Sequence, residues 1–209
     1  MFITFEGIDA SGKSTQLKLM ESALRSRGFD VLATRQPGGT QIGKKIREVI
    51  LNPENVDMAV ETEVLLYMAD RLQHLRQVVR PALAERRVVL CDRYHDALLV
   101  YQGAGREMDL AWLRPLEKKF LISPHVTFWL DISLEESQGR LEKRNQMLGI
   151  ENCRLENETD DFFNRVICAY RSINRREPDR FIRIAADTSR SEIHSAILDV
   201  LIPKLEESE

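Results

Sequence analysis

The sequence has few cysteines, no long apolar run and no excess of basic charge. Its three cysteines, Cys91, Cys153 and Cys168, form no C-x-x-C pair and have no neighbouring histidines; zinc binding and a disulfide framework are therefore not expected. The most apolar stretch, residues 120–132, is interrupted by polar residues and falls short of the roughly 20 residues that span a bilayer. Acidic residues outnumber basic ones, 33 to 30, which argues against non-specific binding of nucleic acid.

These absences favour a cytoplasmic protein that binds neither membranes nor nucleic acid. The first residues include Glu6 and lack the basic start and apolar stretch of a signal peptide, so no export is expected. The chain has 209 residues, of which 43% are hydrophobic and 30% charged. This composition is typical of a globular protein, and the length predicts a single domain, residues 1–209.

Short apolar runs alternate along the chain with longer segments of helical pattern. Strands are predicted at residues 2–5, 31–34, 88–91, 126–130 and 181–184. Helices are predicted at residues 14–27, 61–85 (where Pro81 can introduce a kink), 134–144, 160–175 and after Ser189. This order predicts an α/β fold with a five-stranded parallel sheet, helices on both faces and ligands at the carboxyl ends of the strands.

A glycine-rich segment follows the first strand and opens the first helix. It satisfies G-x-x-x-x-G-K-[ST] in the strand–loop–helix context that this phosphate loop requires, and its predicted cofactor-binding residues are Gly7, Asp9, Ala10, Ser11, Gly12, Lys13, Ser14 and Thr15. Backbone N–H groups of such a loop surround phosphate oxygens, Lys13 can bridge the terminal phosphates and Ser14 can ligate magnesium. We therefore expect a P-loop nucleotide-binding fold that takes ATP and Mg²⁺.

A phosphate loop alone does not separate kinases, GTPases and ATPases. The chain contains no N-K-x-D segment to read guanine, which weakens the GTPase interpretation. Asp9 lies inside the loop, where phosphates repel a carboxylate unless it serves another group such as a sugar hydroxyl. Asp92 and Arg93 end the third strand, where the acid can orient magnesium through water and Arg93 can pair with it or hold a phosphate. A surface salt bridge that closes the strand is the competing interpretation of this pair.

Together these motifs make the sequence resemble the thymidylate kinases, a branch of the nucleoside monophosphate kinases. The resemblance rests on the phosphate loop and on Thr34-Arg35-Gln36-Pro37-Gly38-Gly39-Thr40, Ala69-Asp70-Arg71, Asp92-Arg93-Tyr94, Tyr101-Gln102-Gly103, Arg154-Leu155-Glu156 and Phe162-Phe163-Asn164-Arg165-Val166. It implies phosphoryl transfer from MgATP to thymidylate (dTMP), giving dTDP, usually by a homodimer.

The resemblance also implies roles for individual side chains on the acceptor side. The substrate-binding residues that it suggests are Asp9, Arg35, Tyr67, Arg71, Arg93, Leu98, Tyr101 and Gln102. Asp9 corresponds to the position at the 3′-hydroxyl, Arg35 and Arg93 to positions around the phosphate, and Tyr101 to the position that disfavours ribose. Tyr67 stands where the family places an aromatic ring against thymine, beside Arg71 at the base edge. Helical spacing allows Tyr67 to be a core residue instead.

Phosphoryl transfer requires positive charge on the moving group beyond magnesium and the loop lysine. The phosphate loop supplies no arginine, because Ala10 and Ser11 are neutral. Residues 140–158 therefore resemble the lid of those family members that carry this charge in the lid. The predicted catalytic residues are Lys13, Arg93, Arg144 and Arg154, and the predicted metal site comprises Ser14 and Asp92. For Arg140 and Lys143, a solvated helix face is the alternative.

The sequence departs from the family pattern at four positions. Gln36 replaces the glutamate of Arg-Glu-Pro-Gly-Gly, Ala97 and Leu98 stand where small polar residues are usual, and Cys153 stands where an aspartate often precedes the arginine. A leucine cannot form hydrogen bonds with a pyrimidine edge. Two alternatives therefore stay open: a kinase for another deoxynucleotide or deoxynucleoside, and a non-catalytic nucleotide-binding regulatory protein.

Overall fold

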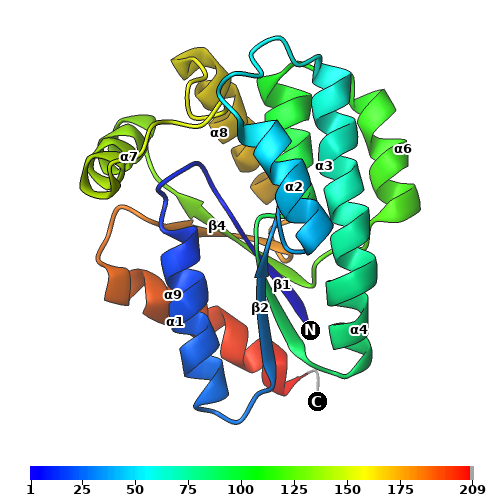
Figure 1. Cartoon of the computed structure of the whole chain (residues 1–209). Coiled ribbons are helices and arrows are strands. Elements are labelled where there is room, and N and C mark those ends of the chain that lie inside the picture. The colour runs from blue at the N-terminus through cyan, green and yellow to red at the C-terminus, as the bar shows by residue number, and fades with distance from the viewer. Residues whose placement is uncertain (208–209) are drawn as a thin grey trace.

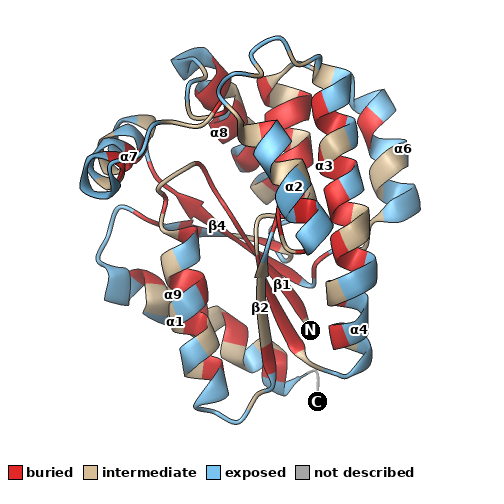
Figure 2. Ribbon diagram, viewed as in Figure 1, coloured by how far each residue is buried: buried red, intermediate tan, exposed pale blue. Residues whose placement is uncertain are grey.

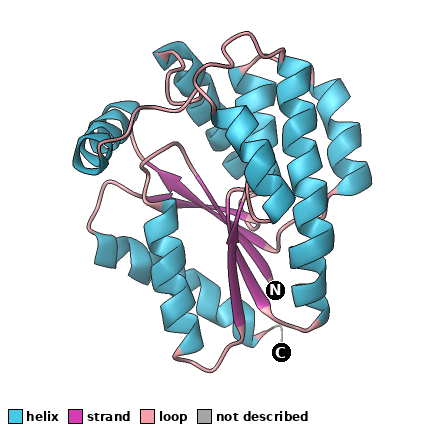
Figure 3. Cartoon of the chain, in the orientation of Figure 1, coloured by secondary structure: helices cyan, strands magenta, loops and turns pink. Residues whose placement is uncertain are grey.

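In the computed structural model, which describes residues 1–207, five strands form one sheet in the order β2-β3-β1-β4-β5, and every pairing is parallel. The strands are β1 Phe2–Glu6, β2 Val31–Arg35, β3 Val88–Asp92, β4 Val126–Asp131 and β5 Phe181–Ala185. Helices surround this sheet (Figures 1 and 3). The predicted α/β fold is confirmed. Each strand ends one residue later than predicted, because backbone pairing continues past the last strongly apolar residue.

Four predicted helices are confirmed with shifted ends, and the long one is divided. The helical elements are α1 Lys13–Arg25, α2 Gln41–Leu51, α3 Val60–His74, η1 Leu75–Val79, α4 Arg80–Ala84, α5 His95–Ala97, η2 Leu98–Gly105, α6 Leu110–Phe120, α7 Leu134–Leu148, α8 Asp160–Arg176 and α9 Arg190–Glu206. The helix predicted at residues 61–85 corresponds to α3, η1 and α4. The π-helical turn η1 lies just before Pro81, whose ring and missing N–H disturb the regular hydrogen-bond pattern.

Helix α2 was not predicted from the sequence, and neither were α5, η2 and α6. The glycines before and inside α2 are typical of a loop. In the structure, however, the Thr40 hydroxyl caps the helix by accepting the Gly43 N–H at 2.9 Å. Gly43 allows close packing of α2 on α3, since a Cβ there would clash with Asp70 Oδ1. This contact between helices decides the local structure.

Helices cover both faces of the sheet (Figures 1 and 2). On one face, Ile3 and Phe5 of β1 share a buried cluster with Leu17 and Met20 of α1, and α9 packs beside α1. On the other face, Phe2 of β1 belongs to a cluster with residues of η1 and α4. The alternation along β1 follows from the two-residue period of a strand. No helix within residues 1–207 is both long and apolar enough to cross a membrane.

Candidate active site

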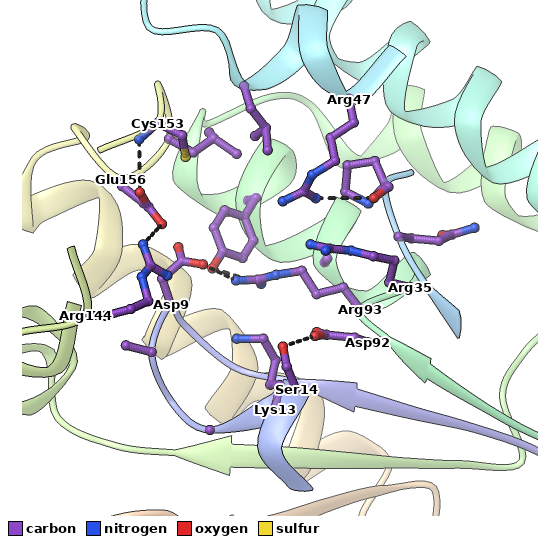
Figure 4. Close-up of a pocket in the computed structure, with 18 of the residues that line it drawn as sticks. Asp9, Lys13, Ser14, Arg35, Arg47, Asp92, Arg93, Arg144, Cys153 and Glu156 are labelled. Carbon is purple, nitrogen blue, oxygen red and sulfur yellow. Dashed lines mark hydrogen bonds and ion pairs between the residues drawn. The ribbon is translucent and has the colours of Figure 1, made fainter. Parts of the chain in front are cut away.

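A cavity of about 780 Å³ lies at the carboxyl ends of β1 and β3, bounded by the phosphate loop, α3 and the segment predicted to form a lid. It gathers most of the predicted site residues: Asp9, Ala10, Gly12, Lys13, Ser14, Thr15, Arg35, Tyr67, Arg71, Asp92, Arg93, Tyr101, Gln102 and Arg144. Four other predicted residues do not line it: Gly7, Ser11, Leu98 and Arg154. Side chains from distant parts of the chain therefore converge on one space (Figure 4).

The phosphate loop is tightly wound between β1 and α1. Gly7 has a φ of +141°, and a Cβ there would lie 2.6 Å from the Leu130 carbonyl oxygen, so only glycine fits. Lys13 is the first residue of α1, and its Nζ donates to the Gly7 carbonyl at 3.0 Å and the Ile8 carbonyl at 2.7 Å. Burial and the nearby Arg93 guanidinium lower the pKa of Lys13 to about 8. The loop therefore presents a lysine and a helix N-terminus to the cavity, which suits phosphate oxygens.

Ser14 and Asp92 bring two hard oxygen donors together beside the loop. The Ser14 hydroxyl donates to Asp92 Oδ2 at 2.5 Å (Figure 4). The described residues contain no group of three or more His, Cys, Asp or Glu side chains that could hold a metal ion. A hydroxyl and a carboxylate suit Mg²⁺, which usually binds through one or two protein oxygens, phosphate oxygens and water. This oxygen pair therefore fits a magnesium ion that arrives with a nucleotide.

Asp9 faces Arg93 across the middle of the cavity. Arg93 Nη2 lies 2.8 Å from Asp9 Oδ1, Nη1 donates to the Tyr101 hydroxyl at 3.0 Å, and the guanidinium lies 4.9 Å from the Tyr101 ring centre. Burial by itself would raise the pKa of Asp9, but Arg93 and Lys13 outweigh it and hold that pKa below its ordinary value. The Asp9 carboxylate is therefore charged at neutral pH, and the position of the Arg93 side chain is fixed.

Two further arginines point toward Arg93 (Figure 4). Arg35 ends β2, and Arg47 extends from α2 with Nη1 donating to the Pro37 carbonyl at 3.2 Å. Burial and the neighbouring Arg35 lower the pKa of Arg47. Three guanidinium groups so close together repel one another, and an anion such as a phosphate would relieve that repulsion.

Sequence reasoning missed Arg47. The pair Ile46 and Ile50, four residues apart and packed in one buried cluster, is the signal that could have predicted α2. Nothing in the sequence indicates that Arg47 on that helix faces the cavity.

Tyr67 and Arg71 lie one turn apart on α3, on the side wall of the cavity. The Arg71 guanidinium lies 5.3 Å from the Tyr67 ring centre and donates from Nη2 to the Tyr94 carbonyl at 3.0 Å. The buried Arg71 Nε and Nη1 have no hydrogen-bond partner within the described chain. Tyr67 both lines the cavity and packs in a hydrophobic cluster. The wall therefore combines an aromatic ring with unused hydrogen-bond donors.

The structure does not bring Leu98 to the cavity. Leu98 is 0% exposed and packs in the core cluster that contains Val64 and Leu113, whereas its neighbour Ala97 lines the cavity. The expectation that Leu98 faces a base is corrected: consecutive residues of a helix project in directions roughly 100° apart, so Leu98 points into the core while Ala97 borders the cavity. Gln102 lines the cavity, but its Nε2 donates to the buried Glu63 carboxylate at 2.8 Å.

The basic residues of the predicted lid have different environments. Arg144 lines the cavity, where its Nη2 donates to Glu156 Oε1 at 2.9 Å (Figure 4). Arg154 points away into the protein. It is ion-paired with the buried Glu63 carboxylate, and its Nε donates to the Ile50 carbonyl at 2.9 Å. Arg154 is buried and is not among the residues that line the cavity.

Two other basic residues of this segment, Arg140 and Lys143, and Arg190 at the start of α9 also line the cavity. From the sequence, Arg140 and Lys143 could belong either to a lid or to a solvated helix face. Their side chains border the same space as the phosphate loop, and they add positive charge to it.

The unusual Gln36 has a matching partner. Its Nε2 donates to His74 Nδ1 at 2.7 Å, and His74 Nε2 lies 2.7 Å from the Thr34 hydroxyl. Burial lowers the pKa of His74 to about 4, so the imidazole is neutral at pH 7 and accepts from the amide. Gln36 is thus hydrogen-bonded to a neutral partner in a buried environment.

Comparisons with known proteins agree with this geometry. The sequence profile of the family "Thymidylate kinase" matches residues 5–197. Over 209 aligned residues, the chain is 40% identical to "Thymidylate kinase" of Exiguobacterium sp. (strain ATCC BAA-1283 / AT1b), covering 99% of this chain and 96% of that protein. It is 43% identical over 199 residues to the protein of that name from Halothermothrix orenii, covering 94% of each. The crystal structure of thymidylate kinase from Ehrlichia chaffeensis superposes with a TM-score of 0.77 at 28% identity, covering 96% of this chain and 97% of that one.

Proposed function

The chain belongs to the thymidylate kinase family, and we propose that it transfers the terminal phosphate of ATP to dTMP, giving ADP and dTDP. The observation that carries this proposal is the arrangement of one cavity. A phosphate loop faces three arginines across the Asp9–Arg93 ion pair. A donor triphosphate on one side and an acceptor monophosphate on the other would then lie with their phosphates adjacent.

On the donor side, the residues of the phosphate loop bind the triphosphate of ATP. Backbone N–H groups after Gly7 and the N-terminus of α1 stabilise its negative charge. Lys13 exchanges its contacts with the loop carbonyls for phosphate oxygens. Mg²⁺ would be held by the Ser14 hydroxyl, with Asp92 orienting its water ligands, and would neutralise charge on the phosphates.

On the acceptor side, Arg35, Arg47 and Arg93 bind the dTMP phosphate. Guanidinium groups match phosphate oxygens bidentately. Asp9 fixes Arg93 and accepts a hydrogen bond from the 3′-hydroxyl of the deoxyribose, while Tyr101 leaves no room for a 2′-hydroxyl. The base packs against Tyr67, whose ring lies at the cavity wall.

The base edge is recognised with few polar groups. The free Nε and Nη1 of Arg71 donate to a thymine carbonyl oxygen. Ala97, which lines the cavity at the position where the family has a small polar residue, gives no hydrogen bond. Discrimination against other pyrimidines therefore depends on Arg71, shape and burial of the thymine methyl group, typically worth about 1 kcal/mol.

Charge that develops on the transferred phosphoryl group is stabilised by Lys13 and by a lid arginine. Arg144 is the best candidate, because it lines the cavity and its side chain is 38% exposed and held by Glu156 alone among carboxylates. Exchange of Glu156 for a phosphate oxygen needs only a side-chain movement. Closure of residues 140–158 would exclude water, so that phosphate passes to the nucleotide and not to solvent.

The protein acts as a cytoplasmic homodimer that binds neither nucleic acid nor membranes. Support for the dimer comes from exposed apolar side chains on the two adjacent helices α2 and α3: Ile42 at 53%, Val49 at 46% and Leu65 at 54% exposure. Exposed apolar groups that gather on neighbouring helices are typical of protein–protein interfaces. The net charge of −3 supports the absence of nucleic-acid binding.

A coupled assay of ATP consumption tests the proposal. The acceptors are dTMP, dUMP, dCMP, dAMP, dGMP and thymidine, each with and without Mg²⁺. We expect the highest kcat/KM with dTMP, and a loss of about 100-fold or more in the Lys13→Ala variant. Lys18→Ala is the matched control, because Lys18 is exposed on the same helix. Preference for another acceptor would indicate a different kinase, and no turnover with any acceptor would favour a regulatory protein.

A further inference from the structure

Glu6 is the last residue of β1 and directly precedes the phosphate loop, yet it is not part of the cavity. Its side chain is 0% exposed and lies on the face of the sheet that also carries Phe2. No ion pair joins it to any residue that the structure describes. Burying a carboxylate without an ion pair costs free energy, so the hydrogen bonds of Glu6 must offset part of that cost.

Each oxygen of this carboxylate accepts one hydrogen bond. Oε1 accepts from the backbone N–H of Tyr94 at 2.7 Å, and Oε2 accepts from the Tyr170 hydroxyl at 2.8 Å. Tyr94 directly follows Arg93, and Tyr170 lies in the middle of α8. Glu6 therefore connects the base of the phosphate loop to the turn that carries Arg93.

The Tyr94 peptide group also reaches the base-binding wall. Its carbonyl oxygen accepts the hydrogen bond from Arg71 Nη2 at 3.0 Å. On its other side, Arg93 adopts a φ of +65°, which is unfavourable for a residue with a side chain, and its N–H donates to the Phe5 carbonyl at 2.9 Å. Phe5 and Glu6, two consecutive residues of β1, thus hold the strained turn between Arg93 and Tyr94.

We propose that Glu6 is a positioning residue for the acceptor nucleotide. By accepting the Tyr94 N–H, it fixes Arg93 and, through the Tyr94 carbonyl, Arg71 at a set distance from the phosphate loop. This inference rests on the proposed function, in which Arg93 contacts the acceptor phosphate and Arg71 contacts the base. One buried carboxylate then aligns both ends of the acceptor with the donor site.

Electrostatics agree with this placement. Burial raises the pKa of Glu6, and the Arg93 guanidinium opposes that rise. Oε1 can accept the Tyr94 N–H whether or not the carboxyl group is protonated, so the positioning contact does not depend on the charge of Glu6.

Kinetics of four variants test the proposal. Glu6→Ala removes both hydrogen bonds, and we expect KM for dTMP to rise about tenfold or more and kcat to fall, with KM for ATP within about twofold. Glu6→Gln keeps a carbonyl oxygen for the Tyr94 N–H and should stay within about threefold of the parent. Tyr170→Phe is the matched control, since it removes only the second hydrogen bond, and KM for dTMP should change less than about twofold. If Glu6→Ala does not fold, Glu6→Asp, whose side chain is one methylene shorter, replaces it. We expect this variant also to have a higher KM for dTMP and a nearly unchanged KM for ATP.

Binding of dTMP without ATP, measured by isothermal titration calorimetry, separates this inference from the proposed function. A parent protein that binds dTMP but does not phosphorylate it would contradict the proposed function, while weaker dTMP binding by Glu6→Ala would still support the positioning role. Three outcomes would overturn the positioning role of Glu6. The first is that Glu6→Ala leaves both dTMP binding and KM for dTMP unchanged, and the second is that it weakens ATP binding as much as dTMP binding. The third is that Glu6→Gln is as impaired as Glu6→Ala.

Discussion

Arg93, which follows β3, forms an ion pair with Asp9 of the phosphate loop at 2.8 Å, with only 17% and 25% of the two side chains exposed. In the proposed function, the pair links the two halves of the cavity, since Asp9 belongs to the phosphate loop that binds ATP and Arg93 to the arginines that bind the acceptor phosphate. A side chain held in this way loses little conformational entropy when a phosphate binds. The fixed pair makes the acceptor side of the site largely preformed.

Removal of Arg93 should therefore affect the acceptor much more than the donor. For Arg93→Ala we expect KM for dTMP to rise about 10- to 100-fold, corresponding to roughly 1.4–2.7 kcal/mol of lost binding, together with a lower kcat. The Kd of ATP should stay within about twofold. The measurements are steady-state kinetics and ATP titration calorimetry, with the exposed Arg175→Ala on α8 as control. Equal weakening of both ligands would assign Arg93 to the donor side.

Leu98→Asn should destabilise the protein without changing its choice of base. Leu98 is 0% exposed in a hydrophobic cluster, so an amide there loses apolar contacts and lacks hydrogen-bond partners, at a cost of about 3 kcal/mol. For a chain of this size, that lowers Tm by roughly 10 °C. Ala97→Ser is the comparison, because Ala97 lines the cavity and a hydroxyl there can sharpen the preference for dTMP over dCMP. A selectivity change in Leu98→Asn would contradict the structure.

Arg144 and Arg154 should separate into one catalytic and one structural residue. Arg144→Ala should lower kcat about 100-fold with little change in Tm, since the side chain borders the cavity. Arg154→Ala should instead lower Tm, because the buried Glu63 loses one of its two arginine partners, at a cost of about 2–3 kcal/mol. Kinetics and calorimetric melting of both variants provide the measurement. A large kcat loss at unchanged Tm in Arg154→Ala would show that Arg154 leaves Glu63 during turnover.

Mild acid should destabilise the folded chain through His74. Burial lowers its pKa from the ordinary 6.5 to about 4, so between these pH values the unfolded state binds more protons than the folded state. Stability is therefore lost as pH falls through this window, by up to about 3 kcal/mol. Urea unfolding at pH 7 and pH 5 should show a smaller pH effect in His74→Gln than in the parent. An unchanged pH effect in His74→Gln would contradict the prediction.

A charge placed on α3 should disrupt the proposed dimer. Leu65 is 54% exposed, and a glutamate there would bury an unpaired charge in the interface. We expect Leu65→Glu to elute as a monomer in size-exclusion chromatography with light scattering, while the parent elutes as a dimer. Leu148→Glu, at the end of α7 and 61% exposed, should leave the dimer intact. A monomeric parent would refute the proposed dimer, and a dimeric Leu65→Glu would exclude this face as its interface.

The amino-acid pattern alone predicts the sheet and the phosphate loop. Continuous apolar runs predict buried parallel strands, and the loop from Gly7 to Ser14 carries its geometry in neighbouring residues: glycines for the sharp turns, then a lysine at the first position of α1. Strand ends share one edge of a parallel sheet, so Asp92 and Arg93 could be placed near that loop from their position alone. These features depend on contacts between residues close in sequence or on the regular sheet.

Contacts between segments far apart in the chain fix where the remaining charged side chains point. Arg47 reaches the cavity because Gly43 lets α2 pack closely on α3, and Arg154 turns away because Glu63 is buried beside it. Leu98 lies in the core because Val64 of α3 and Leu113 of α6 pack around it, and the Glu6 carboxylate accepts the N–H of Tyr94, 88 residues away in the sequence. A long side chain has many rotamers of similar energy, and the partner that selects one of them belongs to a distant segment. The amino-acid pattern therefore indicates which charged residues are candidates for the site, and the packing of helices on the sheet decides which of them contact one another.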